Sequence, residues 1–149
     1  MIVIGFSWLP HHDGSAAVIW DGKLVFASEE ERHTRHKHSP GEPPLNALKK
    51  AFRYLITNGI KPKEVDAYAI NWDPRLYLKS QKPIAGKLIH DYLRKLLINE
   101  AIGIKEFLLY DLAFPNHTSY VISAEKVVRK AIADLGEEAP PEIKIYPVR

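Results

Sequence analysis

The sequence predicts an α/β fold with a mixed five-stranded sheet, in which a three-strand antiparallel meander precedes alternating helices and strands. Two apolar runs of strand length flank Asp21-Gly22, a pair typical of tight hairpins because both residues tolerate positive φ. Later segments alternate between helical apolar spacing and short runs rich in strand-forming residues. The chain has 149 residues, enough to bury one core, so we expect a single domain over residues 1–149.

The strands are predicted from their apolar runs. Residues 2–8 (IVIGFSW) form the first strand, and residues 15–30 contain the second and third. Residues 65–72 (VDAYAINW) are predicted as the fourth strand and residues 142–148 (EIKIYPV) as the fifth. Because helices connect the fourth strand to the fifth, we expect these two to be parallel, with a right-handed crossover.

The first predicted helix covers residues 45–59. Its apolar side chains recur at three- and four-residue spacing: Leu45, Leu48, Phe52, Leu55 and Ile56. Gly59 stands where a C-terminal cap is expected. The polar segment before this helix contains residues that should stop any helix there: Pro40, Gly41, Pro43 and Pro44.

The second half of the chain contains two further predicted helices. Residues 82–101 have an apolar stripe beside basic positions, and residues 123–136 begin at Ser123, a plausible N-cap, and end at Gly136. Residues 105–114 (KEFLLYDLAF) fit either a strand or a helix. The order of these elements resembles that of the ribonuclease-H-like fold shared by actin-like ATPases and sugar kinases. That fold closes with one more helix after the fifth strand, and we expect this final helix to be missing here.

Composition narrows the class of function. The net charge is +3, which fits small phosphate-bearing ligands and is too weak to indicate nucleic acid. No apolar run approaches the about 20 residues of a membrane span, and the first residues lack the features of a signal peptide. With no cysteine either, we expect a cytoplasmic protein. Abundant Lys and Glu with a single Met lean towards a thermophilic source.

The turn between the first two strands, residues 9–15 (LPHHDGS), is the first candidate site. Gly14 permits close backbone approach, and the amides around Gly14 and Ser15 could donate to an anion. Asp13 could hold a cation or a water, and His12 could act as acid, base or hydrogen-bond donor near neutral pH. The alternative is that Asp13, Gly14 and Ser15 only form a tight turn.

The second candidate site is the charged segment 28–38 (SEEERHTRHKH). If the third strand continues through Glu31, any buried acid would need a partner, which Arg32 or Arg35 could supply. The basic residues suit a phosphate or carbamoyl phosphate, since Arg grips two oxygens and Lys acts as a point charge. The alternatives are a charged loop tip and a nucleic-acid patch. The basic residues are Arg32, Arg35, Lys37 and His38.

Taken together, the two segments resemble the N-terminal signature of the carbamoyltransferases that include nodulation and antibiotic-biosynthesis O-carbamoyltransferases. The likeness is dense over residues 5–44, and the order of elements extends it along the chain. The matching positions are Gly5, His12, Asp13, Ser15, Ala16, Ala17, Asp21, Gly22, Ala27, Glu29 to Arg32, Arg35, Lys37, His38 and Pro43 or Pro44.

The resemblance implies a mechanism. Such enzymes are similar to the tRNA threonylcarbamoyl-forming proteins in their nucleotide-binding half, and they use ATP and carbamoyl phosphate to make a carbamoyl-adenylate. The carbamoyl group then passes to a hydroxyl of a small acceptor. By this resemblance His12 is the catalytic residue. The substrate- and phosphate-binding residues would be Asp13, Gly14, Ser15, Arg32, Arg35, Lys37 and His38.

One feature of the family is missing from the sequence. The resemblance implies a His-His-x-x-His motif that binds iron after the fifth strand, and here the sequence ends at Arg149. His90 and His117 are isolated and are not at metal-ligand spacing, so we expect no metal ligands.

We therefore expect the N-terminal lobe of a carbamoyltransferase, either part of a longer enzyme or a naturally short homologue. It should have little activity alone and should self-associate or bind a complementary chain or domain. A truncated, non-enzymatic nucleotide- or phosphate-binding module is the alternative. Binding to a membrane or to nucleic acid is not expected.

Overall fold

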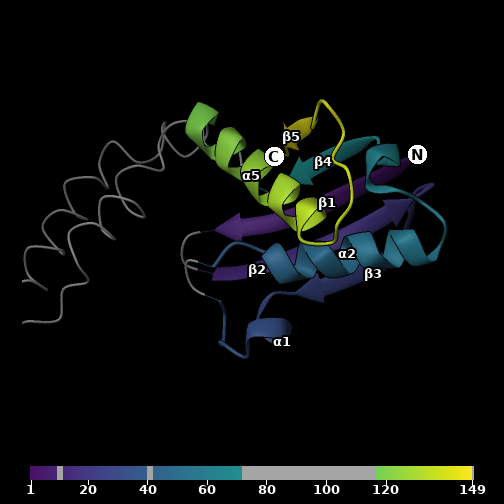
Figure 1. Cartoon of the computed structure of the whole chain (residues 1–149). Coiled ribbons are helices and arrows are strands. Elements are labelled where there is room, and N and C mark those ends of the chain that lie inside the picture. The colour runs from purple at the N-terminus through teal and green to yellow at the C-terminus, as the bar shows by residue number, and fades with distance from the viewer. Residues whose placement is uncertain (10–11, 40–41, 72–116, 149) are drawn as a thin grey trace, which may run out of the picture. The chain divides into compact units, whose positions relative to one another are not determined.

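The computed structural model describes residues 1–9, 12–39, 42–71 and 117–148 (Figure 1). By its internal contacts the chain divides into two compact units, Met1–Trp72 with Val121–Arg149, and Asp73–Tyr120. The elements described are β1 Ile2–Leu9, β2 His12–Trp20, β3 Lys23–Glu29, α1 Glu31–Thr34, α2 Leu45–Thr57, the 3₁₀ turn η1 Pro62–Glu64, β4 Ala67–Ile70, α5 His117–Ala133 and β5 Ile145–Pro147.

The five strands form one mixed sheet in the order β3-β2-β1-β4-β5, which confirms the predicted α/β class. β1 pairs with β2, and β2 with β3, in antiparallel fashion, as the predicted meander requires. β1 pairs with β4, and β4 with β5, in parallel. The predicted parallel pairing of the fourth and fifth strands is therefore confirmed.

The hairpin between β2 and β3 forms where Asp21-Gly22 predicts it. Both residues have left-handed backbone, with φ of 48° at Asp21 and 77° at Gly22. Trp20 and Lys23 face each other across the turn as the last paired residues. Positive φ at both central positions matches the right-handed twist of the flanking strands, which explains the preference for Asp-Gly.

The core lies on one face of the sheet, beneath α2 and α5 (Figure 1). Alternate strand residues point into it because side chains switch faces at every position of a strand. Of the predicted stripe of α2, Leu48, Phe52 and Leu55 are fully buried, whereas Leu45 and Ile56 are half-buried. The fully buried strand and α5 side chains include Ile4, Val18, Tyr68, Ile70, Val128 and Ile132.

The opposite face of the sheet is open over the described residues. The alternate strand positions there are half-buried or exposed, and Leu24 has 66% of its surface in solvent. Ile19, which pairs with Leu24 across β2 and β3, and Tyr146 on β5 are also exposed. Among the helices that the structure describes, none has the length and apolar character needed to cross a membrane.

Several predicted boundaries are wrong. α5 begins at His117, six residues before the predicted N-cap, so Ser123 lies inside the helix. It ends at Ala133, and Gly136, with a φ of 74°, lies in the turn that follows. β3 ends at Glu29 and a four-residue helix, α1, follows it, although the prolines and glycine further on were expected to exclude any helix. The predicted helix 82–101 and the ambiguous segment 105–114 lie outside the described residues.

Candidate functional site

The first candidate segment lies within a strand rather than in a turn. Gly14 and Ser15 belong to β2, and Ser15 pairs with Ser7 of β1 on one side and Glu29 of β3 on the other. The tight-turn interpretation of this segment is therefore wrong. The expectation of a turn through residues 9–15 is corrected in the same way, since β1 runs to Leu9 and β2 starts at His12.

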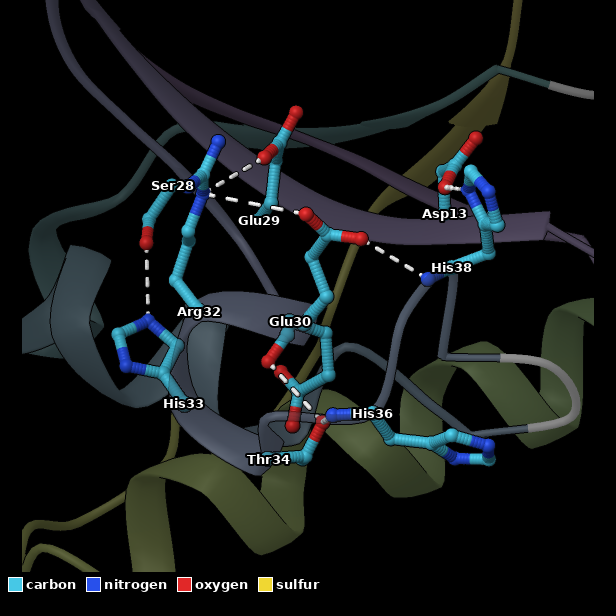
Figure 2. Close-up of polar contacts among 10 residues, drawn as sticks. Asp13, Ser28, Glu29, Glu30, Arg32, His33, Thr34, His36 and His38 are labelled. Carbon is cyan, nitrogen blue, oxygen red and sulfur yellow. Dashed lines mark hydrogen bonds and ion pairs between the residues drawn. The ribbon is translucent and has the colours of Figure 1, made fainter.

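Asp13 and His38 bring the two candidate segments together (Figure 2). The backbone N–H of Asp13 donates to the carbonyl oxygen of His38 over 2.8 Å. Their side chains also meet, with Oδ1 of Asp13 lying 3.1 Å from Nδ1 of His38. The two residues are 25 positions apart, and the β2–β3 hairpin brings them together.

Glu31 completes a small cluster with these two residues. Its Oε2 accepts a hydrogen bond of 2.8 Å from the backbone N–H of His38. One ligand-type atom from each of Asp13, Glu31 and His38 lies within 4.8 Å of the others. We call these three residues the carboxylate–imidazole cluster.

The backbone around the cluster is unusual. Asp13, Arg35, His38 and Ser39 all have positive φ, between 38° and 65°. Such left-handed conformations are uncommon outside glycine and cost free energy unless surrounding contacts hold them. Here the surrounding contacts are the backbone hydrogen bonds from Asp13 to His38 and from Arg35 to Glu31.

Glu30 is a buried structural residue whose partner differs from the one that the sequence predicted. Its residue surface is 1% exposed, and its carboxylate accepts hydrogen bonds from the backbone N–H groups of Asn46 at 3.1 Å and Ala47 at 2.8 Å. The side-chain amide of Asn46 donates a third, at 2.6 Å. The expected partner was Arg32 or Arg35, but the partner is the N-terminus of α2, whose free amides and positive dipole end favour an anion.

A sequence signal for this contact did exist. The residue that precedes α2 is Pro44, which has no side-chain oxygen, and it makes no capping hydrogen bond. The orphan amides of the first turn therefore need an acceptor from elsewhere in the chain. A buried acid at the end of a neighbouring strand can supply that acceptor, as Glu30 does.

Gly14 is packed against the same contact. A Cβ at this position would lie 3.2 Å from Cβ of Glu30, 3.3 Å from the carbonyl oxygen of Glu42 and 3.5 Å from Cα of Pro44. The predicted approach of the Gly14 backbone to an anion stays a prediction. The approaching groups belong to the protein itself, and the Gly14 carbonyl accepts the N–H of Glu30 over 2.7 Å.

The predicted basic residues differ in what they contact. Nε of Arg32 lies 3.1 Å from Glu29 on the surface (Figure 2). Arg35 and Lys37 are exposed, and within the residues that the structure describes neither makes an ion pair. Arg35 and Lys37 lie in the same chain segment as His38, and among the described residues of that segment these two cations could contact an anionic ligand.

The remaining histidines of the charged segment are engaged locally. Nε2 of His33 lies 2.8 Å from the hydroxyl of Ser28, and Nδ1 of His36 lies 3.0 Å from Oε1 of Glu42. His12 is the first residue of β2, opposite Leu9. Its predicted catalytic role stays a prediction.

The sequence profile described as "Carbamoyltransferase N-terminus" matches residues 3–138. Nodulation protein U of Sinorhizobium fredii is 35% identical over 63 residues, covering 42% of this chain and 11% of that protein. Nodulation protein U of Rhizobium tropici is 34% identical over 71 residues, covering 47% of this chain and 12% of that protein.

An uncharacterized protein of Synechocystis sp. is 30% identical over 130 residues, covering 85% of this chain and 18% of that protein. The chain thus spans between about a tenth and a fifth of the length of these relatives. The profile extends over both candidate segments and most of the elements described above. The chain belongs to the carbamoyltransferase N-terminal family.

Proposed function

We propose that this chain is the nucleotide-side lobe of a carbamoyltransferase with a ribonuclease-H-like, actin-like ATPase fold. In this proposal the whole enzyme hydrolyses carbamoyl phosphate to carbamate and phosphate, and the carbamate oxygen attacks the α-phosphate of ATP, which gives carbamoyl-adenylate and releases pyrophosphate. The carbamoyl group then passes to a hydroxyl acceptor and AMP leaves. The observation that carries it is the contact between Asp13 and His38, in a chain of this family whose segment before His38 contains the exposed cations Arg35 and Lys37. The strand order and the parallel β4–β5 pair support the proposed fold.

Carbamoyl transfer requires cationic groups that bind phosphate oxygens and a base that accepts a proton. Arg35 and Lys37 would hold phosphate oxygens, because positive groups stabilise the negative charge that develops on them. His12 would accept the proton of the acceptor hydroxyl. The oxygen of that hydroxyl would attack the carbamoyl carbon as AMP leaves. The acceptor pocket and the second lobe would come from the rest of the enzyme.

The iron site implied by the resemblance does not fit the residues described here. It requires paired histidines, whereas His33 and His36 contact Ser28 and Glu42. We derive no step through iron.

Substrate binding tests the proposal directly. Carbamoyl phosphate and ATP are titrated separately into the purified chain, and binding is followed by ³¹P NMR and calorimetry. We expect the double variant Arg35→Ala/Lys37→Ala to weaken carbamoyl phosphate binding about tenfold or more. Lys63→Ala, an exposed lysine of η1, is the matched control and should bind normally.

A measurement of carbamoyl transfer distinguishes the two candidate functions, which are a carbamoyltransferase lobe and a nucleotide- or phosphate-binding module. We expect little or no transfer by the chain alone, because one lobe leaves the reaction open to water. In the whole enzyme, His12→Ala should lower kcat by a factor of about 10²–10⁴, as loss of a general base does. Phosphate binding without any transfer by the whole protein would instead favour a nucleotide- or phosphate-binding module.

We also propose that the chain acts in the cytoplasm. We further propose that it associates with another chain or domain through the open face of its sheet. Leu24, Ile19 and Tyr146 give that face its exposed apolar surface. A second copy or a complementary domain would cover it.

A further inference from the structure

We propose that the carboxylate–imidazole cluster of Asp13, Glu31 and His38 binds a divalent transition-metal ion. The three donors come from separate parts of the fold: Asp13 from the start of β2, Glu31 from the first residue of α1, and His38 from the loop after α1. One ligand atom from each lies within 4.8 Å of the others. This site is distinct from the paired-histidine iron site of the resemblance.

The spacing of the donors suits a metal ion. Bonds from zinc to histidine nitrogen or carboxylate oxygen are about 2.0–2.2 Å long, so two neighbouring ligands of one ion lie about 3 Å apart. Oδ1 of Asp13 and Nδ1 of His38 are 3.1 Å apart. An ion between them would gain its third ligand by movement of the Glu31 carboxylate, which has an oxygen within 4.8 Å of both atoms.

The backbone already orients these ligands. The N–H of His38 holds the Glu31 carboxylate at 2.8 Å, and the N–H of Asp13 holds the His38 carbonyl at the same distance. Outer hydrogen bonds of this kind fix metal ligands and account for much of the affinity of natural sites. Binding an ion would thus order few additional groups, and the left-handed backbone at Asp13 and His38 serves to aim their side chains.

The charge and exposure of the cluster indicate which metal ion it would bind and whether the site resembles catalytic or structural metal sites. Two carboxylates balance the charge of a dication. The carboxylate oxygens suit Mn²⁺, and the imidazole nitrogen favours Zn²⁺ over Mg²⁺ and Ca²⁺. The side chains of Asp13 and His38 are 59% and 52% exposed, and that of Glu31 is 26% exposed. Three protein ligands at an open surface leave coordination positions for water or another oxygen ligand, as in catalytic rather than structural metal sites.

Direct metal binding tests this proposal. Zn²⁺ is titrated into the purified chain by calorimetry, and Mn²⁺ binding is followed by electron paramagnetic resonance. We expect one site per chain, with affinity reduced about tenfold or more in Asp13→Asn, Glu31→Gln and His38→Ala. Asn and Gln keep a carbonyl oxygen for the existing hydrogen bonds, so the fold is preserved while the anionic ligand is lost.

Two control variants and one mapping experiment complete the test. Glu29→Gln and His36→Ala remove a neighbouring acid and a neighbouring histidine outside the cluster, and should leave affinity unchanged. In the unsubstituted protein, Mn²⁺ should broaden the amide signals of Asp13, Glu31 and His38 before that of Lys63. Absence of binding at millimolar metal, equal affinity in all variants, or broadening elsewhere would overturn the proposal.

The readout uses metal alone. The metal site therefore stands or falls independently of carbamoyl transfer, and a failure of one proposal is distinguishable from a failure of the other.

Discussion

Gly14 and Glu30 are in direct contact where β2 begins and β3 ends beside α2. The carbonyl oxygen of Gly14 accepts the N–H of Glu30 over 2.7 Å, and a Cβ on Gly14 would stand 3.2 Å from that of Glu30. The Glu30 carboxylate in turn binds the first amides of α2. This contact connects the strand that presents Asp13 to the helix that follows the charged loop.

Gly14→Ala should destabilise the fold by about 1–2 kcal/mol, because the added methyl group overpacks a site bounded by backbone on two sides. Gly5→Ala is the matched control. A Cβ there meets no atom within 4 Å, so the change should be neutral or slightly stabilising for a strand residue. Urea unfolding followed by circular dichroism measures both, and equal losses in the two variants would contradict the packing argument.

Glu30→Ala should cost about 2–3 kcal/mol, since it leaves buried amides at the start of α2 without an acceptor. Glu30→Gln should lose less, because its carbonyl oxygen can keep part of the contact. Glu29→Ala changes an exposed acid next in the chain and should stay within about 0.5 kcal/mol of the parent. The comparison uses unfolding free energies from urea titration; a Glu30→Ala variant as stable as Glu29→Ala would refute the capping role.

Asp134 should give the protein a small stability loss in acid. The hydrogen bond from Lys130, helped by the charge of Lys49 on α2, holds the pKa of the Asp134 carboxyl below its ordinary value of 3.8. A carboxyl with a lowered folded-state pKa stabilises the fold above 3.8, and that contribution is lost as the pH falls through the folded value. Because these groups are exposed, the effect should be small and weaker in high salt.

Asp134→Asn therefore should lower the melting temperature slightly at pH 7 and not at pH 2. Thermal melts of parent and variant across this range make the comparison. A difference that persisted at pH 2 would show that the Asp134 charge is not its source.

Tyr68→Phe should leave the protein as stable or make it more stable at pH 7. Its hydroxyl is buried in the core with no hydrogen-bond partner among the described residues, so removing it also removes a desolvated polar group. Burial raises the pKa of Tyr68 above its ordinary value of 10. Below pH 10 Tyr68 is protonated in both the folded and the unfolded chain. As the pH rises above 10, the tyrosine ionises more readily in the unfolded chain than in the folded one, so the free energy of unfolding falls.

The variant should consequently show a smaller loss of stability between pH 9 and pH 11 than the parent protein. Unfolding free energies at both pH values give the measurement. Parallel losses in the two proteins would mean that other groups cause the alkaline destabilisation.

Self-association through the open sheet face should depend on Leu24. Leu24→Lys places a charge in the middle of the exposed apolar positions of β2 and β3 and should shift the protein towards monomer in sedimentation velocity. Lys50→Glu on the exposed side of α2 is the control and should not change the distribution. A parent protein that is monomeric at high concentration would rule out this surface as a self-association site.

The sequence by itself determined the features that depend only on residues close together in the chain. Asp21-Gly22 predicted the hairpin because turn geometry involves only those two residues and their flanks. The apolar stripe of α2 and the glycines after both long helices were also readable, since spacing and positive φ are local properties. The family likeness over residues 5–44 came from the same kind of local pattern, and the matching profile confirms it.

Only the tertiary structure decided which charged residues meet. Glu30 looked like a partner for an arginine, yet it contacts α2, because the end of β3 lies beside amides that Pro44 leaves without a cap. Asp13 looked like a turn residue, yet β2 carries it to His38. Burial and hydrogen-bond satisfaction depend on groups far apart in the chain, so local spacing could propose these residues as a site but could not assign their partners.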